Sequence, residues 1–223
     1  MAHPVAPSPS PSAASSGLAL TGPLSVALVA ALIAGAFWAG AIPFGVLLAR
    51  RRGVDIRAHG SGNIGATNVS RVLGARDGAI VLVLDALKGA LPTALALALA
   101  DPAAPPGIDA RAVALTGGAA ILGHCFSPFL RGRGGKGVAT ALGVFLVLAP
   151  AIVAVAVAIF AAVLAVTRVP ALGSLAAALA ISVGLVAGRG GPDAALAGAT
   201  TALLVYTHRT NLAKLLAKLR DRP

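Results

Sequence analysis

Two glycine-rich segments carry the residue types with the clearest potential for chemistry. The first is G-S-G-N-I-G-A-T-N-V-S-R (60–71), in which Gly60, Gly62 and Gly65 alternate with polar side chains. Glycine allows a positive φ angle and lets backbone N–H groups approach a ligand, so such a loop can form an anion-binding nest. Hydroxyl, amide and guanidinium donors for a phosphate come from Ser61, Asn63, Thr67, Asn68 and Arg71. The alternative is a flexible interhelical loop, which this density of directed donors disfavours.

The second segment is R-G-R-G-G-K-G-V-A-T (131–140), where Lys136 lies between glycines at the expected start of a helix. A helix N-terminus favours bound anions, so we expect Lys136 to contact one. The residues expected to line the same site are Gly134, Gly135, Gly137 and Thr140. The spacing does not match a P-loop and no strand precedes it, which argues against a nucleotide-hydrolysing site. Arg131 and Arg133 fit the alternative, a positively charged anchor at the membrane surface.

Two further pairs of polar residues lie in or beside apolar runs. Asp85 and Lys88 are three residues apart on one helix face, inside an apolar run, and both a substrate contact and a structural ion pair remain open for them. His208 and Asn211 are also three apart, in T-H-R-T-N, and His208 has the side chain that most often serves as a general acid or base. We interpret His124 as structural.

The composition indicates an all-α, polytopic membrane protein. Of the 223 residues 57% are hydrophobic, the mean hydropathy is +0.90, and 11% are charged, against about 25% in soluble domains. The net charge of +11 comes from short basic clusters between apolar runs, which indicates membrane lipid headgroups or phosphate rather than nucleic acid as the partner. A single cysteine, Cys125, excludes a disulfide framework and a cysteine-based metal site.

The apolar runs predict seven transmembrane helices. Residues 1–22 are rich in Ala, Pro and Ser and predict a disordered tail, which leaves 23–219 as one seven-helix domain. The loop 101–109 is a Pro-rich turn, and the basic, amphipathic tail after 207 suits a helix on the membrane surface. The expected spans are 24–49, 77–99, 112–130, 137–149, 151–167, 171–187 and 194–207, of which the region 137–167 could also form one long bent helix.

Basic residues are distributed unequally over the two sides that seven spans define. One side, with the loops 50–76 and 131–136, Arg168 and the C-terminal tail, holds 15 of the 18 Lys and Arg, whereas the other holds only Arg111 and Arg189. Basic loops stay in the cytoplasm, so we expect the N-terminus outside and the C-terminus inside. Both glycine motifs and His208 then lie at the cytoplasmic face.

Several segments together resemble the bacterial acyl-phosphate:glycerol-3-phosphate acyltransferase (PlsY) family. They are A-G-A-I-P-F-G (39–45), G-S-G-N-I-G-A-T-N (60–68), D-A-L-K-G (85–89), L-G-H-C-F-S-P-F-L-R-G-R-G-G-K-G-V-A-T (122–140) and H-R-T-N (208–211). The resemblance covers 36–219. It implies a multi-pass enzyme of the bacterial inner membrane that transfers an acyl group from acyl phosphate to the 1-hydroxyl of glycerol 3-phosphate. The products are lysophosphatidic acid and phosphate, and no metal, cofactor or coenzyme A is implied.

The resemblance also implies site residues. The matching positions are Ser61, Arg71, Lys136, His208 and Asn211. A further family motif, S-L-x-S, reads A-L-G-S (171–174) here, so that Ser174 matches and Ala171 departs from it. The competing classes are an anion transporter, which predicts binding elements at the bilayer midplane rather than at one interface, and a lipid-binding structural protein, which does not need this density of donors.

The orientation can be tested with single cysteines at Ala104→Cys and Leu212→Cys in a Cys125→Ser background. We expect a membrane-impermeant thiol reagent to label position 104 on intact cells and to leave position 212 unlabelled, because basic loops stay inside. The reverse pattern of labelling would overturn the topology.

Overall fold

The computed structural model describes residues 23–100 and 108–220, and every element in these ranges is a helix. The all-α prediction is confirmed for these residues, whereas the expected tail 1–22 and most of the turn 101–109 lie outside them. The elements are α1 (Pro23–Ala41), α2 (Phe44–Arg51), α3 (Ala66–Leu73), α4 (Ala75–Ala98), α5 (Ala110–Cys125), the 3-10 turn η1 (Pro128–Leu130), α6 (Val138–Leu148), α7 (Pro150–Thr167), α8 (Pro170–Gly188) and α9 (Gly191–Arg220).

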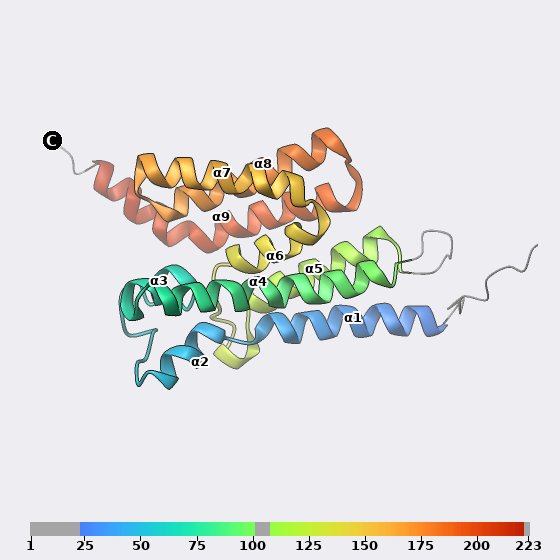
Figure 1. The fold of residues 1–223 in the computed structure, drawn as a ribbon, viewed down its shortest axis with the longest axis horizontal. Coiled ribbons are helices and arrows are strands. Elements are labelled where there is room, and N and C mark those ends of the chain that lie inside the picture. Colours follow the sequence, from blue (N-terminus) through green and yellow to red (C-terminus); the bar gives the residue numbers. More distant parts are fainter. Residues whose placement is uncertain (1–22, 101–107, 221–223) are drawn as a thin grey trace, which may run out of the picture.

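The helices form two layers with α6 between them (Figure 1). One layer contains α7, α8 and α9, and the other contains α1, α2, α4 and α5, with α3 packed against α4 near the end of α2. The main hydrophobic core includes Val144 and Phe145 of α6 together with residues of both layers, and α6 packs against α4 and α5 on one side and α7 and α9 on the other. The short helix α6 therefore joins the layers.

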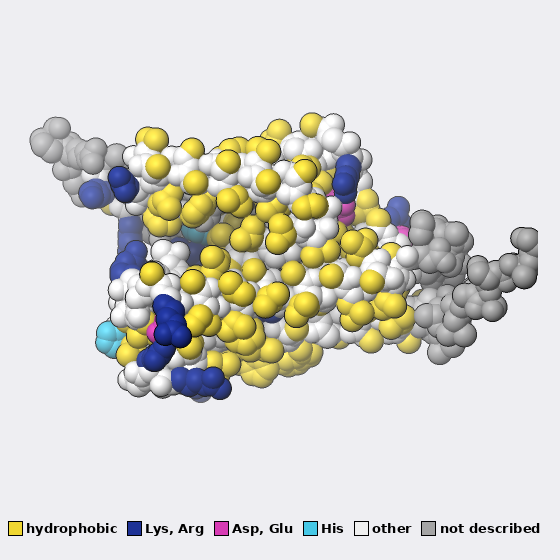
Figure 2. Space-filling view, viewed as in Figure 1, with side chains coloured by type: hydrophobic (Ala, Val, Ile, Leu, Met, Phe, Trp, Pro, Cys, Tyr) yellow, Lys and Arg dark blue, Asp and Glu magenta, His cyan; other side chains and the backbone are white. Residues whose placement is uncertain are grey.

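The surface of this bundle suits a lipid environment. Five helical segments in the described ranges are long and apolar enough to cross a membrane: Ser25–Arg51, Ala75–Ala98, Ala110–Leu130, Pro150–Thr167 and Pro170–Gly188. Large apolar side chains such as Leu91, Val166 and Val186 are exposed on the outside. Figure 2 shows a broad apolar band, with Lys and Arg gathered mainly at the end near α2, α3 and the end of α9. These features define a multi-pass membrane protein.

Proline determines where several helices differ from the predicted spans. The expected span 24–49 is broken between α1 and α2, because Pro43 has no N–H to continue a helix. The expected span 112–130 ends as an α-helix at Cys125, since Ser127 precedes Pro128 and is disfavoured in the α region. The region 137–167 forms two helices rather than one bent helix, because α6 ends at Leu148 and α7 begins at Pro150. The basic C-terminal tail continues α9 without interruption.

Glycines allow α4 and α6 to pack closely. A Cβ atom on Gly89 would collide with the carbonyl of Thr140, and one on Gly143 would collide with the carbonyl of Ala86. Membrane helices commonly use small residues for such close contacts. The position of α6, and of the loop that precedes it, depends on this contact.

The variant Gly143→Ala should lower the free energy of unfolding by about 1–3 kcal/mol, because the added methyl group overpacks the α4–α6 contact. The matched control is Gly198→Ala in α9, where a Cβ would meet no atom within 4 Å. Thermal unfolding in detergent should show a lower Tm for the first variant and an unchanged or slightly higher Tm for the second. Equal shifts would contradict the close packing.

Candidate active site

A cavity of about 580 Å³ lies between the two layers and joins a polar end to an apolar interior. Its apolar walls include Leu142, Val157 and Ala178 from α6, α7 and α8, and the face shown in Figure 2 is hollowed near its basic end. The predicted site residues that line it are Ser61, Asn63, Gly65, Thr67, Asn68, Arg71, Lys136, Gly137, Ser174, His208 and Asn211. The cavity therefore unites motifs that are far apart in the sequence.

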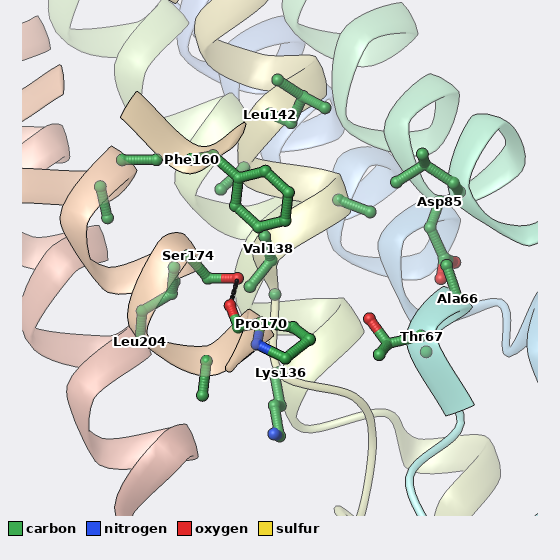
Figure 3. A pocket seen from close by; sticks show the side chains of 18 of the residues that line it. Ala66, Thr67, Asp85, Lys136, Val138, Leu142, Phe160, Pro170, Ser174 and Leu204 are labelled. Atoms are coloured by element: carbon green, nitrogen blue, oxygen red, sulfur yellow. Dashed lines mark hydrogen bonds between the residues drawn. The ribbon is translucent and has the colours of Figure 1, made fainter. Parts of the chain in front are cut away.

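Lys136 is held at the polar end of the cavity by the last helix. Its ammonium nitrogen Nζ donates a 2.7 Å hydrogen bond to Oδ1 of Asn211, and Oγ1 of Thr207 donates to the Lys136 carbonyl at 3.0 Å. Figure 3 shows the Lys136 side chain below Pro170 and across from Thr67. Burial lowers the pKa of Lys136, and the positive charge of Arg71 lowers it further. Two cationic side chains, Lys136 and Arg71, therefore lie together at this end of the cavity.

His208 lies one residue beyond the expected seventh span and is 2% exposed. Its Nδ1 is 2.8 Å from the carbonyl oxygen of Leu204. A carbonyl can only accept, so Nδ1 carries the proton and the neutral ring has its lone pair on Nε2. Burial lowers the pKa of His208, as does the charge of Lys136. The neutral ring is therefore favoured and can accept a proton in the cavity.

Asn68 organises the first glycine motif from within. Its Oδ1 accepts a 2.8 Å hydrogen bond from the N–H of Ser61, and its Nδ2 donates to the carbonyls of Ile56 and His59. Gly60 has a φ of 61°, and a Cβ there would collide with Oδ1 of Asn68. Asn68 is 2% exposed, so it positions the loop, and the predicted donation to a ligand is not supported by these bonds.

Two other predicted donors of this loop also have internal roles. Oδ1 of Asn63 accepts a 2.9 Å hydrogen bond from the N–H of Gly65, which precedes α3. Gly62, with a φ of 70°, donates its N–H to the carbonyl of His59. Gly60 and Gly62 shape the turn, and neither is among the described residues that line the cavity. Ser61 and Thr67 remain as its exposed hydroxyl groups.

Two helix N-termini face the cavity. The first hydrogen bonds of α3 run from Asn68 and Val69 to the carbonyl of Gly65, so the N–H groups of Ala66 and Thr67 precede them. The first bond of α6 runs from Ala141 to Gly137, and the N–H groups of 138–140 precede it in the same way. Helix N-termini attract anions through free N–H groups and the helix dipole. The two motifs therefore place two helix N-termini at the cavity, and their binding of anions stays a prediction.

Part of the second motif is structural rather than ligand-binding. The N–H groups of Gly134 and Gly135 donate to the carbonyls of Cys125 and His124 at 3.1 and 3.0 Å, which fastens the loop to the end of α5. A Cβ on either glycine would collide with His124. Both N–H groups are thus engaged within the protein, and neither Gly134 nor Gly135 is among the described residues that line the cavity, although both were expected to line it. Thr140 is fully buried and does not line the described cavity.

Lys88 belongs to a buried ion pair rather than to the cavity wall. Its Nζ is 2.8 Å from Oδ1 of Asp85 and donates to the carbonyl of Ile42 at 2.8 Å, and both side chains are at most 4% exposed. Lys88 is absent from the described cavity lining, so of the two alternatives these contacts support the structural ion pair and give no support to the substrate contact. The pair joins α4 to the break between α1 and α2.

The sequence analysis did not identify two residues that contribute to the site, His124 and Thr207. His124 lines the cavity beside Asp85, with Nδ1 and Oδ1 3.7 Å apart, although we interpreted His124 as structural. Thr207 fixes the Lys136 carbonyl, and its position four residues before Asn211, on the same helix face, was a usable signal. Ser174 lines the cavity as expected, while its Oγ donates to the carbonyl of Pro170 (Figure 3).

The fold and cavity define a class of protein: a helical membrane protein with cationic side chains and two helix N-termini at the polar end of an apolar cavity. The family model for glycerol-3-phosphate acyltransferase matches residues 30–218. The chain belongs to this family, and the resemblance seen in the sequence is confirmed.

Individual relatives agree with this assignment. The chain is 50% identical over 191 residues to the glycerol-3-phosphate acyltransferase of Myxococcus xanthus (strain DK1622), across 84% of this chain and 96% of that protein. The Geobacter sulfurreducens (strain ATCC 51573 / DSM 12127 / PCA) enzyme of the same name is 47% identical over 189 residues, across 82% and 92%. The crystal structure of PlsY (YgiH), an integral membrane glycerol 3-phosphate acyltransferase, in its glycerol 3-phosphate form has a TM-score of 0.79 at 37% identity, over 86% of this chain and 93% of that one. Its lysophosphatidic acid form gives 0.77 at 36%, over the same shares.

Sulfate, whose charge is constant at alkaline pH, can probe Lys136. The pKa of Lys136 is lowered from 10.5, so the ammonium is fully present below that lowered pKa and is lost as the pH rises through it. Sulfate affinity should therefore fall at alkaline pH below 10.5, whereas Lys136→Arg, which stays charged, should retain it. Calorimetric titrations of both proteins in detergent measure this. A parallel loss in the two proteins would remove Lys136 from the anion site.

Proposed function

We propose that this chain transfers an acyl group from an acyl phosphate to the 1-hydroxyl of glycerol 3-phosphate. The products are lysophosphatidic acid and inorganic phosphate, in phospholipid biosynthesis. One observation carries the proposal: the same cavity has two helix N-termini at its polar end, where anions are favoured, and an apolar channel behind them. Both substrates carry a phosphate, and one of them carries an acyl chain. The glycerol 3-phosphate and lysophosphatidic acid forms of the related crystal structure support the acceptor and the product.

The polar end supplies binding groups for the two phosphates. The N-terminus of α3, together with Arg71, provides one set, and the N-terminus of α6, together with Lys136, provides the other. Charge-assisted hydrogen bonds from such groups are stronger than neutral ones. Asn211 accepts one hydrogen bond from Lys136 and so directs the ammonium group, which leaves its other protons for a ligand.

The chemical step requires little from the protein beyond positioning. The 1-hydroxyl oxygen attacks the acyl carbon, an ester C–O bond forms, and the C–O bond to the donor's phosphate breaks. The hydroxyl proton passes to a nearby base, for which the cavity offers Nε2 of His208 and the departing phosphate. The hydroxyl of Ser61 is suited to stabilise charge on the carbonyl oxygen. Because an acyl phosphate is already activated, positioning can carry the rate without an acyl-enzyme.

The proposed location is the inner membrane, with the active site on the cytoplasmic side and seven crossings within 23–219. The start of α1 and the end of α9 lie at opposite ends of the bundle (Figure 1), which an odd number of crossings requires. The polar end of the cavity lies at the end where Lys and Arg gather (Figure 2), and basic segments favour the cytoplasm. The short α6 and the long α9 would supply the two crossings beyond the five most apolar segments.

A transporter is the competing function, and two features disfavour it. Transporters place their binding site near the bilayer midplane, whereas the cationic side chains that line this cavity, Arg71 and Lys136, lie at its polar end. Beyond the apolar part of the cavity, the chain forms a packed core that includes Leu148 and Leu185. An enzyme that receives both substrates from one side agrees better with this shape.

Replacing Lys136 should separate a catalytic role from an anchoring one. Lys136→Ala should lower kcat/KM with glycerol 3-phosphate at least about tenfold, since a hydrogen bond to a charged group contributes about 1.5–3 kcal/mol. Arg131→Ala is the matched control, because Arg131 is exposed in the same loop and does not line the described cavity. Full activity in both variants would leave the second motif with an anchoring role only.

The donor is tested by comparing palmitoyl phosphate with palmitoyl-coenzyme A at matched concentrations, using purified protein and glycerol 3-phosphate. We expect palmitoyl phosphate to react and palmitoyl-coenzyme A to fail. No histidine of the chain is followed by Asp in the H-x-x-x-x-D spacing of enzymes that use acyl-coenzyme A. The four histidines are His3, His59, His124 and His208, and the residues five positions later are Ser8, Ile64, Phe129 and Ala213. Comparable rates with both donors would contradict the proposal that acyl phosphate is the specific acyl donor.

A further inference from the structure

The apolar channel ends at a floor built from four helices. On each of these helices one cavity-lining residue is the farthest from the polar end: Phe145 on α6, Val153 on α7, Ile181 on α8 and Ala197 on α9. They are 2%, 2%, 7% and 1% exposed. All four belong to the main hydrophobic core, which continues beyond them with Leu148 and Leu185. The channel is therefore closed at this depth by packed side chains.

The depth of the channel corresponds to about one leaflet of a bilayer. From His208 at the polar end to Ala197 at the floor, α9 advances by 11 residues, or about 16 Å at 1.5 Å per residue. The hydrocarbon core of a bilayer is about 30 Å thick, so one leaflet occupies about 15 Å. An acyl chain that keeps its head at Lys136 and runs along the channel would reach the floor with its methyl end.

We propose that this floor, with Phe145 as its largest side chain, sets the upper limit of acyl-chain length that the enzyme accepts. The inference rests on the proposed acyl-transfer function. A chain shorter than the channel gains little from entering it, because lipid is as apolar as the channel wall. A chain longer than the channel must displace the core around Phe145, and overpacking a core is costly. The floor of the channel is therefore where acyl chains are selected by their length.

The channel also has a side that lipid can reach, so the alternative is that long acyl chains extend into the bilayer instead of meeting the floor. Leu82 on α4 and Val157 on α7 both line the cavity and are 42% and 49% exposed. A donor from the membrane can enter there, and a long chain could leave its end in the bilayer through the same side. In that case the floor would have no influence on chain length, and the two arrangements predict different results.

The test is a competition between saturated acyl phosphates, from lauroyl to arachidoyl, for limiting enzyme and glycerol 3-phosphate. The product ratio reports relative kcat/KM for each chain length and does not depend on how much of a variant is folded. Phe145→Ala deepens the channel, and Ala156→Leu, at a buried lining position of α7, narrows it above the floor. Leu146→Ala is the matched control, because Leu146 is the next residue, is 52% exposed and does not line the described cavity.

For the wild-type protein we expect kcat/KM to fall about tenfold or more beyond a limiting chain length. Phe145→Ala should move that limit to longer chains, Ala156→Leu should move it to shorter ones, and Leu146→Ala should leave it in place. If all four proteins share one profile, the floor does not measure the chain and the inference is wrong. A wild-type protein that uses no acyl phosphate of any length would instead refute the proposed function.

Discussion

The site depends on one cation held where the polar entrance meets an apolar interior. The ammonium of Lys136 is fixed by Asn211, and its carbonyl is fixed by Thr207, so α9 controls both ends of this residue. A charge in such a place is stable only if its hydrogen bonds are made. The rest of the bundle provides the conditions for these bonds: a loop fastened to α5, a short α6 that begins beside the lysine, and a last helix long enough to reach it.

Close backbone contacts hold these parts in place. Gly134 and Gly135 bring the second motif against the end of α5, and Gly143 seats α6 on α4. The buried pair of Lys88 and Asp85 adds a polar connection to the break before α2. A buried ion pair contributes little net stability but strongly disfavours arrangements that separate its partners. These contacts give the glycine motifs a fixed geometry even though their sequences look flexible.

The distribution of polarity explains how such a bundle can handle an amphiphile. Charged and hydrogen-bonding groups line one end of the cavity, and apolar side chains of α6, α7 and α8 line the rest. A lipid-like substrate has the same gradient, with its phosphate at the membrane surface and its chain along the bilayer normal. Recognition of the head and accommodation of the chain therefore require no reorientation of the substrate. The closed inner end of the channel is the feature by which the structure would limit the length of the acyl chain.

The sequence by itself determined the helical class and most of the helix positions, and it singled out the two glycine motifs and Lys136, His208 and Asn211, which the structure brings to one cavity. These features are local, because helix caps, glycine turns and helix faces depend on spacing along the chain. Only the tertiary structure decided that Lys88 pairs inward, that Asn68 braces its own loop and that Phe145 closes a channel. Helices that are apolar on all sides, as most of these are, carry no stripe that identifies their neighbours. In lipid their packing follows from shape and close contact, which a sequence pattern does not reveal.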